Sequence, residues 1–340
     1  MKKKILLSLK FLLFLSIGIF FIWIFIRNLT SSQKEEIYHS YLKADFNWLY
    51  LSMLAGLFSH FFRALRWKML LKPLGYNPSN KNMTMAVFIG FLANLALPRL
   101  GEVSKCGAIA KYEKIPINKV LGTVITERGI DLITFVGLFL ITVFTNFKKL
   151  GNYFDIKIIA PIAKKISSLQ NPNLIIYSVL AVIIIGFIIL YRFRDRFSHK
   201  NFYIKTKEIL KGFLEGVKSL TKIEKPFFFI LYTTLIWLCY WLMTQVVFFS
   251  LAETIGLDYG VGLVALMFGS VGLLVVQGGI GIYPAIIAET LFLYSVPQTT
   301  GYALGWLLWS GQTLLVVILG AVSLGLFPIL NRKRQTDAIS

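Results

Sequence analysis

Long apolar segments alternate with short polar ones along most of the chain. The longest apolar segments are residues 5–26, 46–62, 120–144, 173–191, 227–250 and 301–327. A helix needs about 20 predominantly apolar residues to cross ~30 Å of hydrocarbon, so most of these segments are long enough to span a bilayer. The pattern predicts an all-α, polytopic helical membrane protein with about six full spans, in which residues 1–340 form a single membrane domain.

Two further apolar segments are interrupted by proline or glycine. Residues 83–97 end at Pro98, and residues 260–277 run into a glycine-rich segment from Gly278 to Pro284. Each is followed by a shorter helical segment, at 102–112 and at 285–294. Broken backbone at membrane depth is tolerated only where it is buried in protein or lines a cavity. We therefore expect two re-entrant helical hairpins.

The distribution of Lys and Arg predicts the orientation, because positive residues gather on the cytoplasmic side of a membrane. The loop 192–226 holds ten of them against four acidic residues. Lys2–Lys4 precede the first apolar segment, and Arg332–Arg334 follow the last one. We expect this basic loop and both termini in the cytoplasm, with the protein in the cytoplasmic (inner) membrane. The predicted outer loop 148–172 carries five lysines, against the rule.

With both termini and the loop 192–226 in the cytoplasm, the number of spans between them requires the two hairpins to enter the membrane from opposite sides. The first hairpin enters from the cytoplasm. The halves, about 1–145 and about 173–327, then have the same order of elements in opposite orientations. An inverted repeat with paired Gly/Pro-broken segments is typical of secondary transporters, whose substrate site lies at those segments.

The composition narrows the function classes. The chain is 56% hydrophobic, with a mean hydropathy of +0.69 and a net charge of +20. Cytoplasmic basic loops in contact with anionic lipids explain this charge better than nucleic acid does. The two cysteines lie far apart in sequence, and the three histidines have no metal-ligand spacing, so we expect no metal and no cofactor.

Polar and charged residues interrupt the apolar pattern between positions 94 and 131. The candidates among them are Asn94, Arg99, Glu102, Glu127, Arg128 and Asp131. A charge at the bilayer centre costs about 2.5–3.5 kcal/mol on insertion scales, so these side chains should face a protein interior or a watery cavity. Glu127 and Asp131 share one helix face. Either Arg128 or Arg99 pairs with them to hold the hairpin to the span, or the patch binds a charged head group or relays protons. The two interpretations are compatible.

Arg63 and Arg66 lie at the predicted cytoplasmic end of the second span. With Trp67 they either anchor the chain at the membrane surface or, being three residues apart on one helix face, hold a phosphate.

The second hairpin offers a different set of residues. Gly278, Gly279 and Gly281 permit a tight turn, and Glu289 follows in the second turn of the next half-helix. We include all four among the candidate substrate-binding residues.

Taken together, segments 63–67, 98–102 with Asn94, 127–131 and 278–281 resemble the motifs of the lysylphosphatidylglycerol synthase transmembrane-region family. The resemblance covers nearly the whole chain and implies a flippase-like domain with re-entrant helices that translocates a lipid or lipid-linked substrate. Many members carry a Glu shortly after the glycine-rich turn, whereas this chain has Tyr283 and Pro284. Only residues 331–340 follow the last span, so we expect the stand-alone form without the synthase domain.

We therefore expect a non-enzymatic protein that moves an anionic phospholipid or a polyprenyl-phosphate-linked precursor between leaflets. Its partners would be membrane lipids and not nucleic acid, and a dimer is compatible with the sequence. The alternatives are an ion-coupled transporter of a small solute, a membrane enzyme acting on a lipid head group, and a non-catalytic partner of a lipid-modifying enzyme. The sequence contains no His-based, metal or nucleophile constellation that favours the enzyme.

Overall fold

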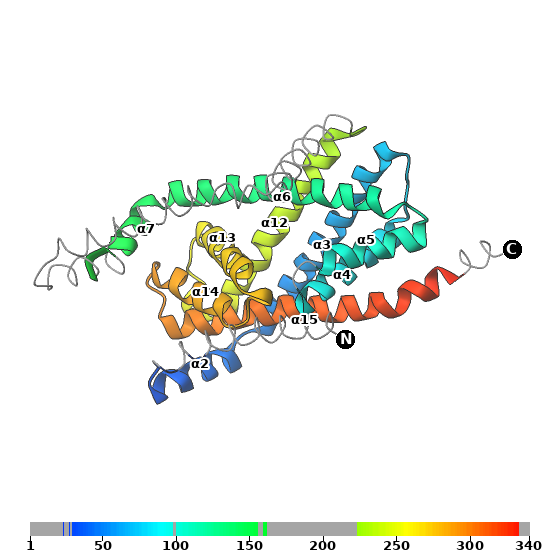
Figure 1. The fold of residues 1–340 in the computed structure, drawn as a ribbon. Helices are drawn as coiled ribbons and strands as arrows, with labels where there is room; N and C mark the ends of the chain where they lie inside the picture. The colour runs from blue at the N-terminus through cyan, green and yellow to red at the C-terminus, as the bar shows by residue number, and fades with distance from the viewer. Residues whose placement is uncertain are drawn as a thin grey trace, which may run out of the picture. The chain divides into compact units, whose positions relative to one another are not determined.

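The computed structural model describes residues 23, 27, 29–97, 100–155, 159–161 and 223–332, and every regular element within them is helical (Figure 1). The α-helices are α2 (Ser31–Lys43), α3 (Phe46–Leu71), α4 (Asn80–Ala96), α5 (Leu100–Glu113), α6 (Ile117–Thr145), α7 (Phe147–Phe154), α12 (Pro226–Gln245), α13 (Tyr259–Val275), α14 (Ile282–Phe292) and α15 (Gln298–Leu330). Short 3-10 helices are η1 (Lys72–Leu74), η3 (Val246–Ser250), η4 (Ala252–Thr254) and η5 (Gln277–Gly279).

Three of the described helices are long and apolar enough to cross a membrane. They are α6, α12 together with η3, and α15. Their bounds match the predicted apolar segments 120–144, 227–250 and 301–327 to within a few residues. The predicted spans at 5–26 and 173–191, apart from Trp23, and residues 192–222 of the predicted loop 192–226 lie outside the described residues.

The polar segment between the predicted spans 5–26 and 46–62 is largely helical, because α2 occupies Ser31–Lys43. Thr30 caps this helix: its Oγ1 accepts from the backbone N–H of Gln33, and the Gln33 side chain accepts from the backbone N–H of Thr30. This reciprocal capping box satisfies two of the helix's otherwise unpaired N–H groups.

α3 is longer than predicted. It continues to Leu71 rather than ending near Phe62, so Arg63 and Arg66 lie inside the helix. The interpretation of Arg63, Arg66 and Trp67 as a surface anchor is wrong, because all three side chains are buried.

The chain divides into two compact units, Met1–Phe139 with Gly216–Ser340, and Leu140–Glu215. In the described part of the second unit, α6 ends at Thr145 and α7 follows directly. In the first unit α3 packs against α12, α4 against α5, and α13 against α14. Figure 1 shows α4 beside α5, and α13 and α14 as a second pair of short helices.

Both short-helix pairs pack on the long helix α15. Its glycines allow the close approach: Gly301 and Gly305 lie against the backbone of Ala288 and Pro284 in α14. Further along the same helix, Gly320 lies against Leu92 of α4. The N-terminal half of α15 therefore supports the second pair and its C-terminal half supports the first.

Candidate functional site

Buried ion pairs join α3 to α6. Arg63 and Arg66 are one turn apart on α3, and Glu127 and Asp131 are one turn apart on α6, so each pair presents its charges on one helix face. Arg63 Nη1 lies 2.8 Å from Glu127 Oε1 and 2.7 Å from Asp131 Oδ2. Arg66 Nη2 lies 2.6 Å from Asp131 Oδ1 and 3.9 Å from Glu127 Oε1. The two helices are thus held by complementary pairs at matched spacing.

Lys105 brings α5 into the same network. Its Nζ lies 2.6 Å from Glu127 Oε2, so Glu127 contacts cations from both α3 and α5. The Lys105 ammonium also lies 4.5 Å from the centre of the Trp67 ring. Trp67 in turn donates from Nε1 to Thr123 Oγ1 of α6 at 3.0 Å. A cation over a tryptophan face is stabilised by the ring quadrupole, and more so when it is desolvated.

The turn between α4 and α5 is fixed by Asn94. Its Oδ1 accepts from the backbone N–H of Gly101 at 2.8 Å, which satisfies one unpaired donor at the start of α5. Arg128 of α6 reaches Glu102 at 2.7 Å, close to this turn. This pair is more exposed than the others, with 44% of the Arg128 side chain accessible, and contributes less stability for that reason.

The network carries an excess of positive charge among the described residues. Four cations, Arg63, Arg66, Lys105 and Arg128, are paired with three carboxylates. Removing one partner of a buried ion pair costs about 3–5 kcal/mol because it leaves an uncompensated charge. The network therefore stabilises the contacts of α6 with α3 and α5. Its one positive charge in excess of the carboxylates favours the binding of an anion nearby.

Tyr240 of α12 connects the network to a cavity. Its hydroxyl accepts from Arg63 Nη2 at 2.9 Å, and its side chain is part of the cavity wall. The Nε groups of Arg63 and Arg66 are buried and have no partner among the described residues. Arg63, which contacts the cavity wall through Tyr240, thus retains one donor without a partner among the described residues.

The cavity has a volume of about 270 Å³ and lies where the two helix pairs approach each other. Its wall contains Phe91 and Leu95 from the end of α4, Leu266, Ser270 and Leu273 from α13, and Gly278 from the glycine-rich turn. α3 adds His60, and α15 adds Trp309, Gln312 and Thr313 among others. The lining is mostly apolar, with a few polar groups, which is typical of sites for small amphiphilic ligands.

Phe91 stands between the cavity and the charged residues. It lines the cavity, and it also lines a small crevice of about 10 Å³ formed with Arg63, Asn94, Lys105 and others. The Arg63 guanidinium lies 5.7 Å from the centre of the Phe91 ring. A crevice of this volume holds about one water molecule. The aromatic ring therefore separates a polar compartment from a larger apolar one.

The glycine-rich turn is built as the sequence predicts. Gly278, Gly279 and Gly281 have φ of 70°, 68° and 74°, a backbone region that residues with a Cβ rarely adopt. Trp309 Nε1 donates to the Gly278 carbonyl at 2.6 Å and ties the turn to α15. The turn is held against the cavity by backbone conformation and by this bond.

Most of the candidate residues from the sequence lie together, although some pair differently from the prediction. Arg63, Arg66, Asn94, Glu102, Glu127, Arg128 and Asp131 surround the ends of α4 and α5. Of the two predicted partners of Glu127 and Asp131, Arg128 pairs with Glu102 instead, and Arg99 is not among the described residues. Among the described residues, the two acids pair with Arg63, Arg66 and Lys105.

The remaining candidates are more dispersed. Gly278 lines the cavity, and Gly279 and Gly281 shape the turn beside it. Glu289 accepts from Gln298 Nε2 at 2.6 Å at the far end of α14 and lines neither the cavity nor the crevice. Arg99 lies outside the described residues.

Sequence reasoning missed Lys105, Tyr240 and His60. Lys105 follows Glu102 by three residues, which places both on one face of α5, and this spacing is a usable signal. His60 precedes Arg63 by three residues on α3 in the same way. Tyr240 lies in a run of apolar and aromatic residues, and no spacing or motif in the sequence distinguishes it from its neighbours.

These observations define a class of protein. It is a helical membrane protein in which a network of buried ion pairs lies beside a cavity between two pairs of short helices, α4–α5 and α13–α14. The family model of the lysylphosphatidylglycerol synthase TM region matches residues 7–321. The chain belongs to this family.

One relative is a UPF0104 membrane protein of Methanocaldococcus jannaschii. It is 36% identical over 92 residues, which covers 25% of this chain and 27% of that protein. No solved structure gives a significant match.

Proposed function

We propose that this protein is a lipid translocase that moves an anionic phospholipid, or a polyprenyl-phosphate-linked precursor, between the leaflets of the cytoplasmic membrane. It acts as a transporter rather than as an enzyme. The observation that carries the proposal is the cavity at Tyr240, where an apolar wall meets a hydrogen bond to the buried Arg63. A phosphate head group and an apolar tail need this combination of surfaces.

The size of the cavity favours a head group as its occupant. About 270 Å³ is near the lower end of the range for small-molecule sites and is too small for a whole phospholipid. In the mechanism proposed here, the head group enters the cavity while the acyl chains stay in the surrounding lipid. The phosphate lies toward Arg63 and Arg66, whose Nε groups retain donors. The glycine-rich turn and the end of α4 form the walls on either side.

The topology supports the same function. In the proposed arrangement α4–α5 and α13–α14 are re-entrant hairpins that enter from opposite sides, within a set of about six full spans. Both hairpins contribute to the cavity wall, through Leu95 on one side and Gly278 on the other. A site between two oppositely inserted hairpins can be reached from either leaflet when one hairpin moves relative to the other.

Leaflet exchange in proteoliposomes tests this function. The purified protein is reconstituted with a fluorescent phosphatidylglycerol, and a membrane-impermeant reductant bleaches the outer leaflet. We expect the bleached fraction to rise beyond the outer-leaflet half faster than in protein-free vesicles that contain the same fluorescent lipid. Exchange at the protein-free rate, together with uptake of a soluble solute, would overturn the proposal in favour of a solute transporter.

A further inference from the structure

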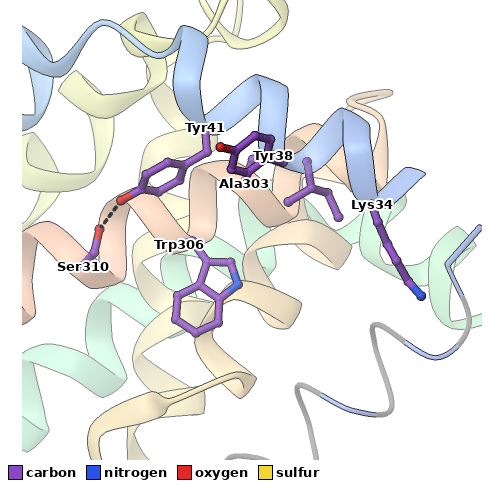
Figure 2. A pocket seen from close by; sticks show the side chains of 7 residues that line it. Lys34, Tyr38, Tyr41, Ala303, Trp306 and Ser310 are labelled. Atoms are coloured by element: carbon purple, nitrogen blue, oxygen red, sulfur yellow. Dashed lines mark hydrogen bonds between the residues drawn. The ribbon is translucent and has the colours of Figure 1, made fainter. Parts of the chain in front are cut away.

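A second hollow lies between α2 and the N-terminal half of α15. It is a groove of about 320 Å³ (Figure 2). α2 contributes Lys34, Ile37, Tyr38 and Tyr41, and α15 contributes Trp306 and Ser310 among others. None of these residues belongs to the ionic network or lines the cavity described above. The groove is therefore a separate candidate site.

The groove follows the length of α2 along α15. Tyr41 Oη and Ser310 Oγ lie 3.5 Å apart at one end, as the dashed line in Figure 2 shows, and Lys34 lies at the other end. In the proposed orientation, the N-terminal half of α15 lies in the outer half of the bilayer. The groove then runs from near the membrane centre toward the outer surface, with Lys34 at the surface end.

The residues that line the groove suit the head group and the adjoining part of an acyl chain of an anionic lipid. Among the described residues that line the groove, Lys34 is the one that carries a charge. The acidic neighbour Glu35 lies outside the lining, 3.7 Å from His39. Below Lys34 the walls are the rings of Tyr38, Tyr41 and Trp306, and amphipathic aromatic side chains are typical of the membrane interface.

We propose that this groove binds one phospholipid of the outer leaflet, with its phosphate at the Lys34 ammonium and one acyl chain along Tyr38, Tyr41 and Trp306. Charge complementarity supports the phosphate position, and the apolar aromatic wall supports the chain position. The site does not depend on lipid translocation. It is nevertheless close to the cavity, because the Trp306 ring lies 5.3 Å, edge to face, from Trp309, which lines the cavity.

Photolabelling of the full-length protein in nanodiscs tests the site. The probe is a phosphatidylglycerol that carries a diazirine in one acyl chain, and labelled peptides are located by mass spectrometry. We expect labels on the peptides that contain residues 37–41 and 303–310. Lys34→Gln should reduce this labelling several-fold, and Lys34→Arg should retain it. Lys43→Gln is the matched control, because Lys43 lies on the same helix but outside the groove. Labelling of the lipid-facing part of α6 serves as the internal standard, so a poorly folded variant is recognised.

Two results would overturn the proposal. The first is equal labelling of the groove by a diazirine diacylglycerol without phosphate, unaffected by Lys34→Gln, since this would make the groove an ordinary lipid-facing surface. The second is an absence of groove labelling in the wild-type protein while α6 is labelled. A cysteine crosslink from the segment before residue 29 to position 306 would then identify that segment as the occupant. Lipid exchange in the translocation assay is measured in parallel and can fail without affecting either result.

Discussion

Arg63 Nη2 donates a hydrogen bond of 2.9 Å to Tyr240 Oη, and through this bond the buried ion pairs reach the wall of the cavity. The other Nη group of Arg63 is occupied by Glu127 and Asp131. The same guanidinium therefore holds α3 to α6 and orients a cavity side chain on α12. In the proposed function Arg63 serves both the stability of the fold and the binding of substrate, so a variant of Arg63 itself cannot separate the two roles.

Tyr240→Phe separates the two roles. It removes the hydroxyl at the cavity wall and leaves the carboxylates of the network in place. A hydrogen bond to a charged group contributes about 1.5–3 kcal/mol, and about 1.4 kcal/mol corresponds to a tenfold change in rate. We expect leaflet exchange of fluorescent phosphatidylglycerol to fall about tenfold. Tyr232→Phe on the same helix is the control and should exchange lipid as the wild type does. Equal rates for the two variants would mean that Tyr240 does not take part.

Glu127→Gln should destabilise the fold strongly. Glu127 is fully buried and contacts Arg63 and Lys105, so its neutral form leaves buried positive charge without a partner. The expected loss is about 3–5 kcal/mol in the free energy of unfolding. The control Glu102→Gln removes the partner of the more exposed Arg128 and should cost about 1 kcal/mol or less. Thermal unfolding can be followed with a thiol-reactive dye, because Cys106 and Cys239 are both buried and free. Equal decreases in Tm for Glu127→Gln and Glu102→Gln would contradict the prediction that Glu127 contributes more to stability.

Gly278→Ala tests the glycine-rich turn. No atom lies within 4 Å of the position that a Cβ would take, so the variant isolates the backbone effect of a φ of 70°. We expect a loss of about 1–2 kcal/mol in unfolding free energy. Gly256→Ala is the matched control, with equally open surroundings and no positive φ, and should be nearly neutral. A neutral Gly278→Ala would show that the turn has a different conformation in the membrane.

Cysteine labelling tests the two re-entrant hairpins. In a variant without the native cysteines, Lys81→Cys and Lys114→Cys place thiols at exposed positions at the two ends of α4–α5, and Ile255→Cys and Ser295→Cys do so beside α13–α14. We expect an impermeant maleimide to label the first two from the cytoplasmic side alone and the other two from the outside alone. Labelling of Lys81→Cys and Lys114→Cys from opposite sides would make α4–α5 a span rather than a hairpin.

The fold was predictable where hydropathy alone decides it. α6, α12 and α15 have the bounds that their apolar segments predict, and Pro98 and the Gly278 segment mark the breaks. α2 was missed because its sequence is polar, although Thr30 and Gln33 carry the spacing of a capping box. α3 was predicted too short because Arg63 and Arg66 were assigned to a membrane surface. A helix can bury such charges when a neighbouring helix supplies residues of opposite charge. The sequence around Arg63 and Arg66 does not indicate which helix will be that neighbour.

Part of the ionic network was predictable as a set of residues, but its ion pairs were not. Arg63 with Arg66 and Glu127 with Asp131 each occupy one helix face, and their matching spacing was visible in the sequence. Their pairing depends on the packing of α3 against α6, which hydropathy does not specify. Tyr240 became recognisable only through its hydrogen bond to Arg63 and its place in the cavity wall.

Blocking the cavity tests the central claim most directly. Ser270 lines the cavity, and Ser270→Cys in a background without Cys106 and Cys239 provides one thiol there. Leaflet exchange of fluorescent phosphatidylglycerol is measured before and after reaction with a benzyl methanethiosulfonate, with the extent of modification determined by mass spectrometry. We expect exchange to fall to the protein-free rate on modification and to recover when the disulfide is reduced. Undiminished exchange by fully modified protein would contradict passage of the head group through this cavity.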